Sequence, residues 1–116
     1  DMLVMNFGAL IKTAEEVAQA LNATLLDMRF VKPLDKELMA EHANGKKAII
    51  TIEDGAISGG AGSAVSEWAQ ENKMKQQIII CGIPDKFVNH ASRDEMLEMT
   101  GLDTKGILAK VEDCLS

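Results

Sequence analysis

The sequence predicts a three-layer α/β/α domain built on a mainly parallel sheet of four strands. Three observations support this fold class. Apolar runs of strand length alternate along the chain with segments of helical periodicity, and the connections between them are short. The strand runs are continuously apolar, which is typical of a sheet covered by helices on both faces. Right-handed crossovers then place every strand-to-helix loop at one edge of the sheet.

The first half of the chain alternates between strand-like runs and helical periods. After the tight turn Phe7-Gly8, apolar residues recur every 3.6 residues until Asn22, which ends the first helix. Pro33 breaks the chain after the second strand, and Asp35 is a natural N-cap for a short helix. The expected strands are residues 2–6, 23–28 and 47–52, and the expected helices are residues 10–21 and 35–44.

The second half of the chain continues the alternation. A helical face of small and apolar residues that includes Trp68 follows a glycine-rich turn. Residues 92–95 form a capping box, Gly101 stops the helix that follows it, and Asp103 caps the last helix. The expected strand is residues 77–81, and the expected helices are residues 61–69, 92–100 and 103–115.

Composition, charge and cysteine content limit the classes to which this protein can belong. The 116 residues predict one domain, residues 1–116, with 47% apolar and 26% charged residues. A net charge of −6 argues against nucleic-acid binding, because no basic stripe can displace counterions from phosphates. Cys81 and Cys114 lack metal-site spacing and are expected to be reduced packing residues in a cytoplasmic protein. No apolar run is long enough to span a membrane. The chain starts at Asp1 on strand-like sequence, so we expect a domain cut from a longer chain.

The carboxyl edge of the sheet is the expected functional edge. With strand order 2-1-3-4, a crevice opens beside the glycine-rich turn Gly59-Gly60-Ala61-Gly62. Such a turn at a helix N-terminus either binds an anion or seats another protein surface. It is neither a dinucleotide-binding motif nor a P-loop, and the acidic residues before it would repel an anion. Interface or packing glycines are therefore the favoured interpretation, with ligand binding as the alternative. The polar residues expected at this edge are Asn6, Asp27, Arg29, Glu53, Asp54 and Asp85.

No complete catalytic set accompanies this edge. Glu53 and Asp54 are adjacent at a strand end and tend to point apart, so pairing with Arg29, Lys32 or a neighbouring domain is favoured over acid–base or magnesium chemistry. His42 is expected to be a surface residue on the short helix. His90 is the better functional candidate, but no nucleophile is tied to it by spacing. We expect no metal site, because the two histidines are far apart and no other ligands cluster with them.

Four motifs, taken together, resemble one family closely. They are DMRFVKPLD at residues 27–35, the acidic pair followed by GGAGS within residues 53–63, GIPDKFV at residues 82–88, and GLD at residues 101–103. In this order and spacing they resemble the C-terminal domains of 1-deoxy-D-xylulose-5-phosphate synthases, which belong to the transketolase-like, thiamine-diphosphate-dependent group. The resemblance covers almost the whole chain. Equivalent domains of transketolases or 2-oxo acid dehydrogenase β subunits remain an alternative, as does a small-molecule- or nucleotide-binding regulatory domain.

The resemblance implies a fold and separate roles for the domains of the full enzyme. It implies an antiparallel edge strand upstream of Asp1, without which the second strand is left exposed. It implies that thiamine diphosphate and magnesium are held by two preceding domains, which also supply the catalytic residues. This chain would then carry no catalytic, cofactor or metal residue and be inactive alone, while docking on those domains and helping to build a homodimer. Valine at Gly60 or Gly62 is expected to harm assembly more than chemistry. The residues expected at the interface, or at a ligand loop, are Arg29, Lys32, Glu53, Asp54, Gly59, Gly60, Gly62, Ser63 and His90.

Overall fold

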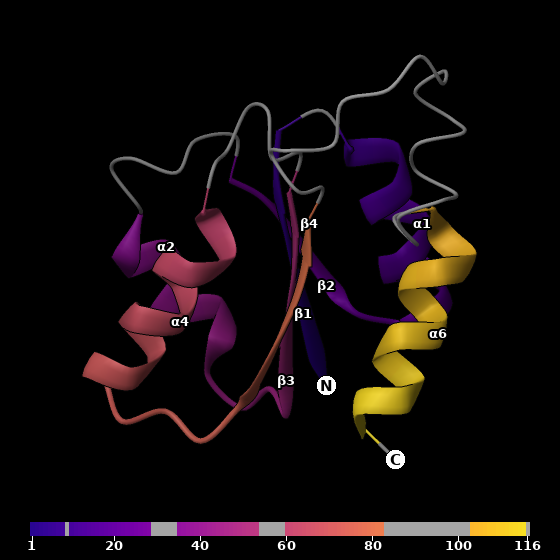
Figure 1. The fold of residues 1–116 in the computed structure, drawn as a ribbon. Helices are drawn as coiled ribbons and strands as arrows, with labels where there is room; N and C mark the ends of the chain where they lie inside the picture. Colours follow the sequence, from indigo (N-terminus) through magenta and orange to yellow (C-terminus); the bar gives the residue numbers. More distant parts are fainter. Residues whose placement is uncertain (9, 29–34, 54–59, 83–102, 116) are drawn as a thin grey trace.

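A single parallel sheet forms the centre of the molecule (Figure 1). The computed structural model describes residues 1–8, 10–28, 35–53, 60–82 and 103–115. Within them the strands lie in the order β2-β1-β3-β4, and every neighbouring pair is parallel. The predicted order 2-1-3-4 and the mainly parallel sheet are therefore confirmed. The strands are β1 (Met2–Phe7), β2 (Thr24–Asp27), β3 (Ala48–Glu53) and β4 (Gln77–Gly82).

Helices cover both faces of this sheet, as predicted. Helices α1 and α6 lie on one face, and α2 and α4 lie on the other (Figure 1). None of these helices combines the length and apolarity needed to cross a bilayer. The helix predicted at residues 92–100, with its capping box, lies outside the described residues. The described helices are α1 (Ile11–Leu21), α2 (Lys36–Ala43), α4 (Ala61–Glu71) and α6 (Thr104–Leu115).

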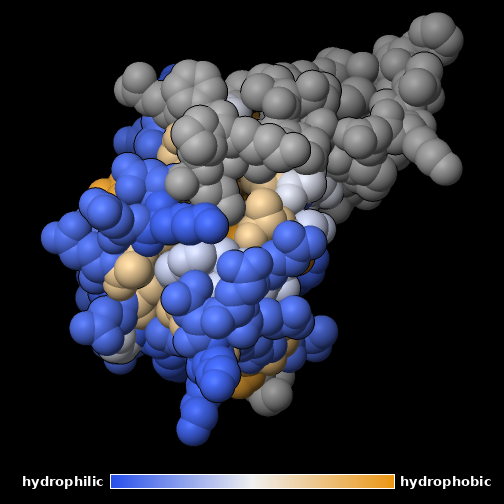
Figure 2. Space-filling model, turned by 90° about the vertical axis from the view of Figure 1, so that its left-hand side faces the viewer, coloured by the Kyte–Doolittle hydropathy of each residue, from blue (hydrophilic) through white to orange (hydrophobic). Residues whose placement is uncertain are grey.

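The alternation of side chains along the central strands creates two apolar cores. Val4 and Ile50 point toward α1 and α6, whereas Leu3 and Met5 point toward α2 and α4. Every residue of β3 is buried, which explains why its apolar residues do not alternate with exposed polar ones, and its two polar residues, Thr51 and Glu53, are buried as well. Trp68 of α4 belongs to the second core. Figure 2 shows the outer face of the α2 and α4 layer, which is mainly hydrophilic with small apolar patches between polar side chains.

Local signals set the helix ends. Asp35 Oδ1 accepts a hydrogen bond from the Leu38 backbone N–H at 3.0 Å, so Asp35 caps α2 as predicted. Asp103 Oδ1 likewise accepts from the Gly106 N–H at 2.8 Å at the start of α6. Asn22 ends α1 in the left-handed conformation with φ 51°, which asparagine tolerates better than most residues. The predicted boundaries agree with the structure because these signals lie within one turn of the residues they control.

We expect Asp103→Ala to lower the free energy of unfolding by about 0.5–2 kcal/mol, because the α6 N-terminus loses its side-chain acceptor. Urea denaturation followed by circular dichroism measures this loss. Asp103→Ser is the matched control, because serine also caps helices, and it should retain most of the stability. Equal stability of the alanine and serine variants would show that this cap is not used.

Candidate functional site

Glu53 links the end of β3 to the start of α4. The residue is the last of β3, and its side chain is almost fully buried, with 7% exposed. Its Oε2 accepts a hydrogen bond of 2.7 Å from the backbone N–H of Ala61, the first residue of α4. A carboxylate at this point satisfies one of the unpaired N–H groups and interacts favourably with the positive end of the helix dipole. The N-terminus of α4 thus holds an anion that the chain itself supplies.

This contact bears on the two interpretations of the glycine-rich turn. An external phosphate or carboxylate at the α4 N-terminus would have to compete with the covalently attached carboxylate of Glu53 for the same donor. It would also meet the charge of that carboxylate at close range. The geometry therefore favours a structural role for this turn over anion binding. Of the turn itself, Gly60, Ala61 and Gly62 are among the described residues, and Gly59 is not.

Gly82 makes room for the Glu53 side chain. The two residues are partners in the parallel register of β3 and β4. A Cβ atom on residue 82 would lie 2.9 Å from Glu53 Cγ and 3.0 Å from Oε1, which is closer than carbon atoms pack. The sequence showed Gly82 as part of a turn and of a family motif, without this contact. The signal that could have revealed it is a glycine in register with a strand-end glutamate on the neighbouring strand.

Gly62 allows α4 to approach the sheet closely. A Cβ atom on this buried residue would lie 2.5 Å from Ile80 Cγ2 and 3.0 Å from Thr51 Oγ1. Gly60 differs, because it is exposed, has φ +89° and has open space where a Cβ would be. Ser63 is also exposed. Among the expected interface residues that are described, Gly60 and Ser63 thus face outward, whereas Glu53 and Gly62 are packed inside the domain.

The remaining expected site residues lie outside the described residues. They are Arg29, Lys32, Asp54, Gly59 and His90, and Asp85 at the same sheet edge lies outside as well. The interface role of the whole set remains a prediction.

A polar contact joins the ends of β1 and β2 at the same edge. Asn6 Nδ2 donates to Asp27 Oδ1 at 3.3 Å and to the Gly8 carbonyl oxygen at 3.2 Å. These two polar residues were expected at the carboxyl edge, and the structure brings them together. Asn6 is fully buried, and its Oδ1 has no hydrogen-bond partner among the described residues. The hydroxyl of Thr51, beneath Gly62, is also buried and likewise lacks a partner in the described part of the chain.

Nothing in the described part of the chain assembles a metal centre or a catalytic set. No group of three or more His, Cys, Asp or Glu side chains there could hold a metal ion. His42 Nδ1 lies 3.0 Å from the Leu38 carbonyl oxygen within α2, which is a local contact along one helix. Cys81 is buried and Cys114 is exposed, both as free thiols. Burial raises the pKa of the Cys81 thiol above its ordinary value, so this residue is less reactive as a nucleophile.

Comparison with known families gives one match over most of the chain. The model of the family described as "Transketolase, C-terminal domain" matches residues 1–107. Among curated proteins, the 1-deoxy-D-xylulose-5-phosphate synthase of Sodalis glossinidius is 44% identical over 113 residues, which is 97% of this chain. The synthase of Pseudoalteromonas translucida is 47% identical over 109 residues, which is 94% of this chain. In both cases the chain spans 18% of the relative's length.

A solved structure agrees with these sequence comparisons. The protein titled "Split gene transketolase, inactive beta4 tetramer" superimposes with a TM-score of 0.80 at 28% sequence identity. The superposition covers 97% of this chain and 38% of that protein. The resemblance drawn from the four motifs is therefore confirmed, both in sequence and in fold.

We expect Glu53→Ala to lower the free energy of unfolding by about 1–3 kcal/mol, because the α4 N-terminus loses a buried acceptor. Glu53→Gln keeps a side-chain oxygen in place and should lose less. Urea denaturation monitored by the fluorescence of Trp68 measures both variants. Glu71→Ala, at the exposed far end of α4, should change stability by less than about 0.5 kcal/mol. A Glu53→Ala variant as stable as the parent would contradict the anchoring role.

We expect Gly62→Ala to lower the free energy of unfolding by about 1–3 kcal/mol, because the new methyl group overlaps the Ile80 side chain. The double variant Gly62→Ala/Ile80→Ala should lose less than the sum of the single variants, because truncating Ile80 removes the atoms that clash. Urea denaturation of all three variants completes the cycle. Strict additivity would mean that the overlap is relieved elsewhere. The larger Gly62→Val change is then expected to impair assembly through the fold of this domain.

Proposed function

Since this chain belongs to the transketolase C-terminal-domain family, we propose that it is the C-terminal assembly domain of a 1-deoxy-D-xylulose-5-phosphate synthase. The full enzyme would condense pyruvate with glyceraldehyde 3-phosphate, with loss of carbon dioxide, to supply isoprenoid precursors. The relatives described above are named 1-deoxy-D-xylulose-5-phosphate synthase, which supports this proposal, and the chain spans 18% of their length. The cytoplasmic location expected from the two reduced cysteines is part of the same proposal.

One observation carries the assignment of a non-catalytic role, namely the carboxylate of Glu53 at the N-terminus of α4. The glycine-rich turn is where a diphosphate would be expected in an open α/β sheet, and there the chain's own carboxylate accepts from the first helical N–H. The described residues around this turn therefore do not fit thiamine diphosphate, nor do they offer a cluster of magnesium ligands. We place the cofactor, the metal and the reacting groups in the preceding domains.

The same observation disfavours the ligand-binding alternative considered from sequence. A nucleotide- or phosphate-binding regulatory domain would need the turn to be open to an anion. The equivalent domain of a transketolase or a dehydrogenase β subunit is disfavoured for another reason, because the relatives at 44–47% identity are synthases. The proposed partners are the preceding domains of the same polypeptide and, through them, a second subunit.

We expect this chain to replace the corresponding segment of a relative. In the Pseudoalteromonas translucida synthase, deletion of the matched 109-residue segment should abolish dimer formation and turnover. Insertion of this chain at that place should restore turnover to within about tenfold of the natural enzyme, a difference of ~1.4 kcal/mol in the activation free energy. Coupled product assays and light scattering measure turnover and dimer content.

Two controls define the outcome of this replacement. This chain alone, with thiamine diphosphate, magnesium and pyruvate, should release no carbon dioxide. Release of carbon dioxide by the chain alone would overturn the proposal of a non-catalytic domain. Full turnover and wild-type dimer content in the deletion variant would overturn the assembly role.

A further inference from the structure

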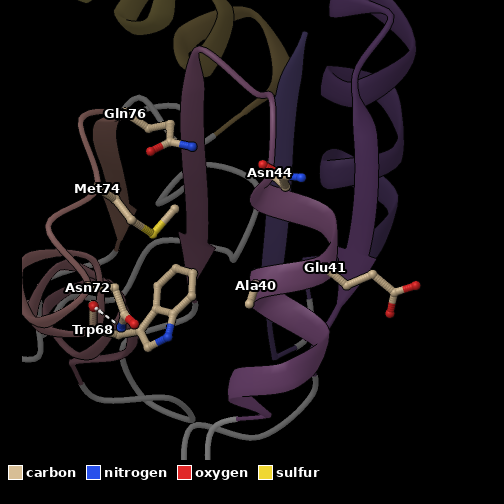
Figure 3. A pocket seen from close by; sticks show the side chains of 7 residues that line it. All are labelled: Ala40, Glu41, Asn44, Trp68, Asn72, Met74 and Gln76. Atoms are coloured by element: carbon tan, nitrogen blue, oxygen red, sulfur yellow. Dashed lines mark hydrogen bonds between the residues drawn. The ribbon is translucent and has the colours of Figure 1, made fainter.

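A groove runs between α2 and α4 on the outer face of the molecule. It consists of two adjoining hollows of about 500 and 440 Å³, which share Ala40, Trp68 and Asn72. In Figure 3, Trp68 and Met74 point toward α2, where the small side chain of Ala40 leaves space. Each volume lies in the range of about 300–1,000 Å³ that binding pockets occupy. We call this feature the α2–α4 groove.

The floor of the α2–α4 groove is apolar. Trp68 is the largest side chain that lines both hollows, and it is only 5% exposed because α4 packs it into the second core. Met74 is half-buried beside it (Figure 3). A thioether and an indole edge form a surface on which an aliphatic chain can lie. The floor therefore suits a long side chain with methylene groups.

Two side-chain amides lie beside this floor. Asn72 Nδ2 donates to the Trp68 carbonyl oxygen at 2.8 Å, which is the dashed line in Figure 3. Gln76 Nε2 donates to the Ala43 carbonyl oxygen at 3.0 Å. Each amide nitrogen thus has one of its two N–H groups bound to the main chain, and each amide oxygen can accept from a ligand.

The charged lining residues add to this acceptor character. Glu37, Glu41 and Glu71 line the groove, against a single lysine among its lining residues, Lys36. In Figure 3 the side chain of Glu41 points away from Trp68 and the hollow, so the acidic character of the groove rests on Glu37 and Glu71. An apolar floor, amide oxygens and a net negative rim together favour a cationic group with several donors. The guanidinium of arginine has five N–H donors in a fixed fork and a flexible aliphatic stem.

We infer that the α2–α4 groove binds an arginine-bearing segment of a neighbouring domain. The stem of the arginine lies along Trp68 and Met74, and its guanidinium donates to the amide oxygens and the rim carboxylates. This inference rests on the proposed function, because it takes the neighbouring domain to be part of the same synthase. It adds that the neighbouring domain presents an arginine to the α2 and α4 layer of this domain.

The first test uses the single tryptophan of the chain. Because Trp68 is the only tryptophan, its indole N–H gives one NMR signal that reports on the groove. The probe is an acetylated and amidated Leu-Arg-Ala-Leu-Arg peptide, compared with the same peptide in which citrulline replaces arginine. We expect a saturable shift of the indole signal with the arginine peptide and none with the uncharged one. Equal shifts with both peptides, or no saturable shift, would overturn the inference.

A pair of variants separates a local site from general attraction to an acidic protein. Glu71→Lys changes the charge of the groove, whereas Glu15→Lys makes the same change on the exposed side of α1, on the opposite face of the sheet. We expect Glu71→Lys to weaken peptide binding roughly two- to fivefold, which is the contribution of an exposed ion pair. Glu15→Lys should leave it unchanged. Equal weakening by both variants would mean that only net charge matters.

The same pair of variants in the synthase chimera tests the occupant. We expect Glu71→Lys to reduce dimer content or raise the concentration needed for assembly, and Glu15→Lys to have no effect. If the parent chimera assembles and both variants match it, the groove does not dock a neighbouring domain, and the inference fails while the proposed function stands. If the parent chimera itself does not assemble, the proposed function fails.

Discussion

The hydrogen bond from the Ala61 N–H to the Glu53 carboxylate is the contact on which this edge of the domain depends. Glu53 is only 7% exposed, so its side chain loses most of its hydration, and that loss must be offset by interactions within the protein. The bond of 2.7 Å and the positive end of α4 supply them. Because the bond joins the last residue of β3 to the first residue of α4, it fixes where the helix starts relative to the sheet. The side chain of Glu53 is therefore both an anchor for α4 and the occupant of its anion site.

Two glycines make this arrangement possible by allowing close packing. Gly82 leaves space on β4 for the Glu53 side chain, and Gly62 lets the first turn of α4 lie against Ile80 and Thr51. In a P-loop or a dinucleotide-binding turn, glycines allow a phosphate to approach the backbone. Here the closest atoms around Gly62 and Gly82 belong to side chains of the same domain. Of the two described glycines in the glycine-rich motif, Gly62 is explained by packing, whereas Gly60 meets open space.

The distribution of packed and exposed residues bears on which surface of the domain can bind a partner. In the described residues, the edge where open α/β sheets bind ligands is held by the protein's own groups, with Asn6 joined to Asp27 and Glu53 joined to Ala61. The hollow with an apolar floor lies elsewhere, between α2 and α4. Among the described residues, this edge is therefore filled by the protein's own side chains, and the hollow lies on the helical face. The proposed assembly role rests on this arrangement.

The sequence by itself predicted the spans of the described elements, the mainly parallel sheet and the caps at Asp35 and Asp103. These follow from apolar periodicity and from contacts within one helical turn, so neighbouring residues suffice to reveal them. The strand order β2-β1-β3-β4 entered as a hypothesis about this fold class, because it depends on contacts between distant segments, and the structure confirms it. Only the tertiary structure decided which atoms meet across elements. Glu53 reaches Ala61 across the glycine-rich turn, Gly82 lies beside Glu53 through strand register, and Gly62 packs against Ile80. Each of these contacts depends on the register between β3 and β4 and on the distance between α4 and the sheet. The pattern of residue types along the chain specifies neither of them. The α2–α4 groove is decided in the same way, because its walls come from segments that are separated by β3 in the sequence.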